Sequence, residues 1–210
     1  MPRRMIVGMT GVTGAVFGVE LLRRLRQQPD VETHLVLSPW ARSTVRLETG
    51  LSAHEVTDLA DATYAWNDQG APISSGSFRG DAMVIAPCGL KTLAGICTGC
   101  AEGLISRAAD ATLKAGRRLV LVARDPLSES HLDNMLALTR MGARIVPPMP
   151  ACYYRPETIG DPVSHVVVRV LDQLDIHVPS AQRWNGMSHS PALQGTSTDV
   201  RDHRPPDPPL

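Results

Sequence analysis

Short apolar segments alternate with stretches of helical periodicity along most of the chain. Apolar runs of strand length end in glycine, proline or serine, and they cover residues 4–9, 34–37, 82–86, 118–123 and 143–146. Apolar residues at helical spacing cover residues 15–25, 101–115, 131–141 and 162–174. Strands that alternate with helices form parallel sheets with helices on both faces. We therefore predict an α/β fold, doubly wound around a mostly parallel sheet.

The C-terminal segment has a different composition. From about Trp184 onward the chain is rich in Ser, His, Asp and Pro, and it lacks the apolar side chains that would offset the entropy of ordering. We expect one folded domain over residues 1–184 and a tail over residues 185–210 that is flexible or lies across a neighbouring subunit.

Charge and cysteine content narrow the functional classes. The 210 residues contain 21 Lys plus Arg and 21 Asp plus Glu, so no overall field favours nucleic acid or a membrane surface. The N-terminal apolar run, broken by Gly8, is too short for a signal peptide, and no segment has the length of a membrane span. Four cysteines without a secretory signal indicate reduced thiols in a cytoplasmic protein. Cys97 and Cys100 lack the second ligand pair of a zinc site, so we predict no metal.

The turn after the first strand contains Gly8, Gly11 and Gly14. Ligands of parallel sheets bind beyond the carboxyl ends of the strands, and glycines at a helix start let the backbone approach an anion. The three-and-three spacing differs from the dinucleotide fingerprint. The second strand ends at Ser38, whose hydroxyl suits a phosphate better than a ribose diol. The turn indicates a phosphate or flavin cradle, with close helix–sheet packing as the alternative.

Two later turns lie at the same predicted edge. Residues 89–92 follow the strand at 82–86 and supply small residues, a cation and a hydroxyl, which suit a second anion contact or an ordinary helix start. Arg124 and Asp125 follow the strand at 118–123, as site residues or as a loop ion pair.

Other charged and aromatic residues are ambiguous on spacing alone. Arg107, Asp110 and Lys114 share one helix face, where Asp110 and Lys114 suit a surface ion pair. Arg169 lies off the apolar stripe of its helix, as solvated residues do. Tyr153 and its neighbouring tyrosine, in a proline-rich loop, suit a pocket wall.

Seven segments together resemble the UbiX-type flavin prenyltransferases, especially the B subunits encoded beside UbiD-type phenolic acid decarboxylases. The similar segments run in order through residues 8–15, 32–38, 73–78, 91–95, 107–114, 131–136 and 147–156. The resemblance implies a Rossmann-like flavoprotein that joins a dimethylallyl group from dimethylallyl phosphate to N5 and C6 of reduced FMN. It also implies a homododecamer whose product, prenylated FMN, serves a partner UbiD-type decarboxylase.

The resemblance also implies roles for individual residues. FMN would be held by Gly11, Val12, Thr13, Ser38, Gly89, Leu90, Lys91, Thr92 and Arg124. Dimethylallyl phosphate would be surrounded by Arg107, Lys114, Tyr153 and Arg169. Thr13, Asp125 and Lys114 would be the catalytic residues, with Thr13 and Asp125 handling protons near the reacting flavin atoms.

The chain departs from the usual family pattern at four positions. It has Thr13 for Ser, Asp125 for Glu in a loop one residue shorter, Gly89 for Ser and Pro39 for Lys. A shorter acid in a shorter loop either still reaches the flavin or leaves the proton acceptor out of range. Two other functions therefore stay open, a flavoprotein that does not prenylate and a decarboxylase subunit that binds no cofactor.

Overall fold

Six parallel strands form one sheet. The computed structural model describes residues 2–125, 127–179, 181, 183, 184 and 186. The strands are β1 (Arg3–Met9), β2 (Val31–Leu37), β3 (Ala62–Tyr64), β4 (Ala82–Cys88), β5 (Arg118–Ala123) and β6 (Arg144–Ile145). They lie in the order β3-β2-β1-β4-β5-β6, and every pair is parallel. The connections change direction between β1 and β4, where ligands of such sheets bind.

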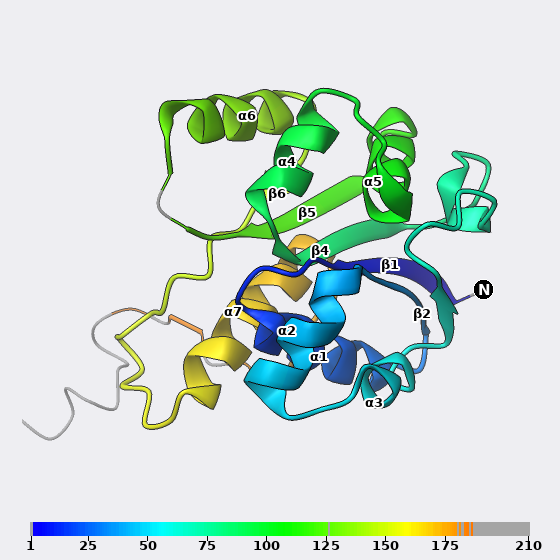
Figure 1. The fold of residues 1–210 in the computed structure, drawn as a ribbon. Helices are drawn as coiled ribbons and strands as arrows, with labels where there is room; N and C mark the ends of the chain where they lie inside the picture. The colour runs from blue at the N-terminus through cyan, green and yellow to red at the C-terminus, as the bar shows by residue number, and fades with distance from the viewer. Residues whose placement is uncertain (1, 126, 180, 182, 185, 187–210) are drawn as a thin grey trace, which may run out of the picture. The chain divides into compact units, whose positions relative to one another are not determined.

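Helices cover both faces of the sheet, which confirms the predicted doubly wound fold (Figure 1). Helix α1 packs against α7 and α2 on one side, and α4 packs against α5 and α6 on the other. The helices are α1 (Ala15–Arg26), α2 (Pro39–Thr49), α3 (Ala53–Thr57), the short 3₁₀ helix η1 (Pro72–Ser74), α4 (Leu90–Cys97), α5 (Gly103–Lys114), α6 (Glu129–Arg140) and α7 (Gly160–Gln173).

Burial on both faces explains the continuous apolar runs of the central strands. All seven residues of β4 are buried, as expected for a parallel strand between two layers of helices. On one face Met83 and Ile85 pack with Leu104 of α5 in the main core cluster. On the other face α1 comes so close that a Cβ on Gly18 would lie 2.4 Å from the Ala86 carbonyl oxygen. Gly18 is therefore required by helix–sheet packing.

The strand β3 and the helices α2, α3 and α4 lie outside the elements that the sequence predicts. Strand β3 has three residues, and α3 has five. Helix α2 buries only Ala41 and Val45, and it begins with Pro39 at its first position. Helix α4 follows the turn at residues 89–92, which the sequence indicated only as a helix start.

The contacts divide the chain into a unit that ends at Pro179 and a second unit from Ser180 to Leu210. Apart from Gly186, the tail expected at residues 185–210 lies outside the described residues. No helix among the described residues is long and apolar enough to cross a membrane.

Candidate functional site

Thr10 fastens the two central turns to each other. Its Oγ1 donates a hydrogen bond to the Pro87 carbonyl oxygen at 2.8 Å and accepts one from the Gly89 N–H at 2.8 Å. The side chain is buried, so both bonds are shielded from water. The turn after β1 and the turn after β4 therefore form one rigid unit. Sequence analysis missed Thr10, although a hydroxyl at a strand end was a usable signal.

The first turn is shaped by contacts with α2. A Cβ on Gly11 would lie 2.1 Å from the Trp40 Cβ, and Thr44 donates a hydrogen bond to the Gly11 carbonyl oxygen at 2.9 Å. Gly14 adopts a left-handed conformation with φ of 110° just before α1. Close packing against α2 thus accounts for Gly11, and the left-handed backbone accounts for Gly14. Val12 is half-buried and Thr13 is exposed at the tip of the turn.

Glu48 occupies the N-terminus of α1. Its carboxylate accepts hydrogen bonds from the Gly14 N–H at 3.0 Å and the Ala15 N–H at 2.8 Å. The sequence led us to expect that these donors face a ligand anion, and the structure gives them to the chain's own carboxylate instead. Such donors at a helix start favour any nearby negative charge. Glu48 was also missed, because nothing in its local sequence marks a contact 33 residues away.

Ser38 caps α2. Its Oγ accepts a hydrogen bond from the Ala41 N–H at 3.2 Å, and its own N–H donates to the Met9 carbonyl oxygen at 3.0 Å. The hydroxyl proton is not used by the cap. Ser38 can therefore donate to an anion while it holds α2 against the end of β1.

The N-terminus of α4 is the better place for an anion. The residue before its first turn is Gly89, which has no side chain to cap the helix. The N–H groups of a helix start favour negative charge. Lys91 adds a cation to this turn: its Nζ lies 3.4 Å from Glu102 Oε2, and its side chain is 87% exposed. Below this turn, burial raises the pKa of Cys88 to about 12, so that thiol is neutral and unsuited to nucleophilic chemistry.

Arg124 and Asp125 lie at the carboxyl end of β5, and both are exposed. Asp125 has a φ of 131°, a region that residues with a side chain rarely adopt and that costs on the order of 1–3 kcal/mol. Strain of this kind gathers at functional sites. The backbone geometry thus marks Asp125 independently of its charge.

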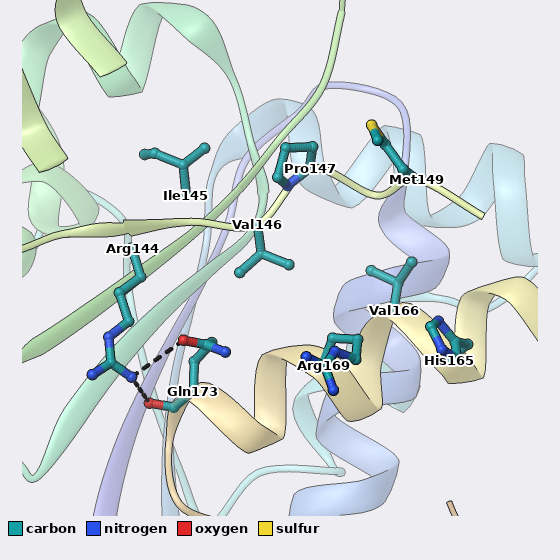
Figure 2. A pocket seen from close by; sticks show the side chains of 9 residues that line it. All are labelled: Arg144, Ile145, Val146, Pro147, Met149, His165, Val166, Arg169 and Gln173. Atoms are coloured by element: carbon teal, nitrogen blue, oxygen red, sulfur yellow. Dashed lines mark hydrogen bonds between the residues drawn. The ribbon is translucent and has the colours of Figure 1, made fainter. Parts of the chain in front are cut away.

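A cavity of about 300 Å³ lies between α7 and the strand β6 with the loop after it (Figure 2). Arg169 lines this cavity from α7, although the helical pattern predicted a merely solvated side chain. Its Nη1 lies 3.0 Å from Asp172 Oδ2. On the strand side, Arg144 donates hydrogen bonds to the carbonyl oxygen and Oε1 of Gln173. The cavity thus combines two guanidinium groups with an apolar wall.

Tyr153 and Tyr154 pack around His165 of α7. The Tyr153 hydroxyl lies 3.2 Å from His165 Nε2, and the Tyr154 ring stacks on the imidazole with centroids 5.1 Å apart. Burial, followed by the nearby Arg169 charge, lowers the pKa of His165, and burial raises the pKa of Tyr154. The tyrosine pair therefore packs on His165, but the cavity lining includes neither ring, so their role as a pocket wall stays a prediction. His165 had no sequence signal beyond its helical position.

Arg107 and Lys114 line a different cavity, of about 260 Å³, together with Asp110. The predicted ion pair is present, since Lys114 Nζ lies 2.7 Å from Asp110 Oδ2. Arg107 Nε donates to the Ser74 carbonyl oxygen at 3.1 Å. Lys114 ends α5 just before β5 begins, so it lies toward the amino end of β5, away from the two central turns. One protomer therefore does not bring the four predicted donor-binding residues together.

The fold and the two linked turns define the class. A parallel sheet whose connections reverse between β1 and β4, with an anion-binding turn at that point, is typical of α/β proteins that bind nucleotides or flavins. The Flavoprotein family model matches residues 1–174. The chain belongs to this family, among the UbiX-like flavin prenyltransferases.

Three known proteins illustrate the likeness. A probable UbiX-like flavin prenyltransferase of Streptomyces sp. (strain D7) is 65% identical over 88% of this chain and 92% of its own. The crystal structure of a dodecameric FMN-dependent UbiX-like decarboxylase from Escherichia coli O157:H7 is 60% identical, with a TM-score of 0.86 over 87% of this chain and 100% of that one. AnUbiX in complex with FMN and dimethylallyl pyrophosphate is 51% identical, with a TM-score of 0.87 over 89% of this chain and 99% of that one.

Proposed function

We propose that this protein is a flavin prenyltransferase that joins a dimethylallyl group from dimethylallyl phosphate to N5 and C6 of reduced FMN. The product, prenylated FMN, serves a partner UbiD-type decarboxylase. The observation that carries the proposal is the family match over residues 1–174, which include the two linked turns and both cavities. The neutral chain with four free thiols is typical of the cytoplasm, where we place it.

The residues of the linked turns fit FMN. The uncapped N-terminus of α4 at residues 89–92 and the free hydroxyl proton of Ser38 suit its phosphate. A Cβ on Gly89 would lie 3.0 Å from Val12 Cγ1, so the absence of a side chain lets the two linked turns pack closely. We propose that Gly11, Val12, Thr13 and Arg124 would also hold FMN. When bound, reduced FMN supplies the nucleophilic N5 and C6 atoms.

The cations of the two cavities suit the prenyl donor. Prenyl transfer requires the phosphate to leave from an allylic carbon, and fixed positive charge around the leaving group lowers that barrier. Arg169 lines one cavity, with Tyr153 beside it on His165, and Arg107 and Lys114 line the other. Holding the donor beside the acceptor supplies much of the remaining rate enhancement.

Assembly completes the site. Because the two cavities share no lining residue within one protomer, we propose a homododecamer in which neighbouring copies bring Arg107 and Lys114 to the linked turns. The dodecamer of the Escherichia coli O157:H7 relative supports this arrangement. We further propose that residues 1–184 form the FMN-binding domain and that residues 185–210 are a flexible or subunit-crossing tail.

Proton transfers fall to residues at the edge of the sheet. Asp125 has an exposed carboxylate on a strained backbone, and Thr13 has an exposed hydroxyl at the tip of the first turn. We propose that these two groups move protons near N5 and C6, while Lys114 stabilises the departing phosphate.

Activation of a decarboxylase tests the proposal. The purified protein is incubated without oxygen with reduced FMN and dimethylallyl phosphate, and the filtrate is added to a UbiD-type decarboxylase that lacks its cofactor. We expect decarboxylation to appear, and to stay absent when the prenyl donor is omitted. A protein that binds FMN but never activates the decarboxylase is a non-prenylating flavoprotein, and a colourless protein is an accessory subunit.

A further inference from the structure

His165 contacts two tyrosines at the wall of the α7 cavity. It lines the cavity four residues before Arg169, on the same face of α7 (Figure 2). Its Nε2 lies 3.2 Å from the Tyr153 hydroxyl, and its ring is covered by Tyr154, with an interplanar angle of 22°. The imidazole thus lies in the cavity lining together with Arg169 and contacts the Tyr153 hydroxyl beside the cavity.

Packing alone does not explain the imidazole nitrogens. Nδ1 of His165 is buried and has no hydrogen-bond partner among the described residues, and an unpaired buried nitrogen costs free energy. A phenyl ring would fill the same place against Tyr154 without that cost. The contact between Nε2 and Tyr153 is the interaction that only an imidazole provides here.

We propose that His165 is a positioning residue of the prenyl-donor site, which orients the Tyr153 hydroxyl toward the donor phosphate. This inference rests on the proposed function, which places that phosphate beside Arg169 and Tyr153. A phenol has one proton, and it can donate to an anion only if that proton is not given to His165. Nε2 of His165 must therefore carry the proton of their shared hydrogen bond, and Nδ1 must be the unprotonated nitrogen.

The surroundings of His165 keep the imidazole neutral. The charged or titratable groups that face it are Tyr153, Tyr154, Arg169 and Asp172. Burial and the Arg169 charge lower its pKa, so the imidazole is neutral at neutral pH. A neutral ring with the proton on Nε2 leaves the whole positive charge of the cavity on the guanidinium groups. His165 then orients the Tyr153 hydroxyl, and Arg169 provides the positive charge for the donor phosphate.

Donor binding to the complex with oxidised FMN, which gives no turnover, tests this role by calorimetry with dimethylallyl phosphate. His165→Phe keeps the ring stacked on Tyr154 and removes the N–H, and we expect a Kd about tenfold higher, the equivalent of one hydrogen bond. His165→Gln retains a donor and should restore most of the affinity. The Kd for FMN should not change in either variant.

A double-mutant cycle separates positioning from a structural role. If His165 acts through Tyr153, the His165→Phe change should add nothing in a Tyr153→Phe background. An unchanged Kd in His165→Phe, or effects that simply add, would overturn the inference. If the wild type binds donor but forms no prenylated flavin, the proposed function fails while the role of His165 in donor binding stands. If the wild type binds no donor, both fail.

Discussion

The carboxylate of Glu48 accepts a hydrogen bond from the Ala15 N–H at 2.8 Å, at the first residue of α1. A helix start beside a glycine-rich turn is usually interpreted as a phosphate site. Here the anion is a side chain of α2, so the contact joins α2 to the start of α1. The donors that we propose for a ligand are therefore the N–H groups at the start of α4 and the hydroxyl of Ser38.

Removal of Glu48 should therefore destabilise the fold directly. Glu48→Ala leaves two backbone N–H groups without their charged acceptor, and we expect the free energy of unfolding to fall by about 1–3 kcal/mol. Glu48→Gln keeps one acceptor oxygen and should lose less. Urea denaturation measures both variants, and an unchanged midpoint for Glu48→Ala would contradict this account of the contact.

Substitution of Thr10 should lower both the affinity for FMN and the free energy of unfolding. Thr10→Val has nearly the same shape but leaves the Gly89 N–H unpaired, which costs about 1–3 kcal/mol. Because Gly89 caps α4, the affinity for FMN should fall as well. Thr139→Val is the matched control, since Thr139 only bonds back to Met135 on the exposed helix α6. Flavin fluorescence during titration distinguishes the two variants, and equal affinities would show that the turns are held in another way.

We expect the Asp125 side chain to lower the stability of the fold and to be required for prenylation. Asp125→Gly removes the side chain from a φ of 131°, and we expect the protein to gain about 1 kcal/mol or more of stability. Asp125→Asn should leave stability and FMN binding nearly unchanged. Both variants should lose prenylation steeply, on the order of a hundredfold to ten-thousandfold. If Asp125→Asn prenylates FMN at the wild-type rate, Thr13 or the phosphate must move the proton.

Substitution of the proposed donor-binding arginines should weaken donor binding without weakening FMN binding. Arg169→Ala and Arg107→Ala should each weaken binding of dimethylallyl phosphate at least tenfold, because each removes a fixed charge from the leaving group. FMN binding should stay nearly intact. Arg140→Ala, at the exposed end of α6, is the control and should change neither affinity. Parallel titrations with FMN and with donor check this, and an equal loss of both affinities would place these arginines at the flavin instead.

The order and type of the main elements could be predicted because parallel strands buried on both faces leave continuous apolar runs, as in β4 and β5. The candidate site was only partly predictable, because sequence order places the residues at strand ends but not the residues that act through tertiary contacts. Residues that follow a strand, such as Ser38 and Asp125, could be placed at the carboxyl edge from sequence order alone. Glu48 and His165 act through tertiary contacts, which no local pattern records, and for Thr10 the only local signal is a hydroxyl at a strand end.

Arg169 shows a second limit of sequence reasoning. Its position off the apolar stripe of α7 correctly predicted that the guanidinium is not in the core. It could not reveal that β6 and its following loop lie opposite and enclose a cavity around it. Only the resemblance to a family assigned Arg169 to a ligand.

The mass of the flavin released after reaction tests the central claim most directly. The protein is incubated anaerobically with reduced FMN and either dimethylallyl phosphate or dimethylallyl pyrophosphate, then denatured, and the released flavin is weighed by mass spectrometry. We predict a flavin heavier than FMN by one five-carbon prenyl unit with at least one donor, and only FMN without a donor. Recovery of unmodified FMN with both donors, from protein shown to bind FMN, would contradict the assignment as a prenyltransferase.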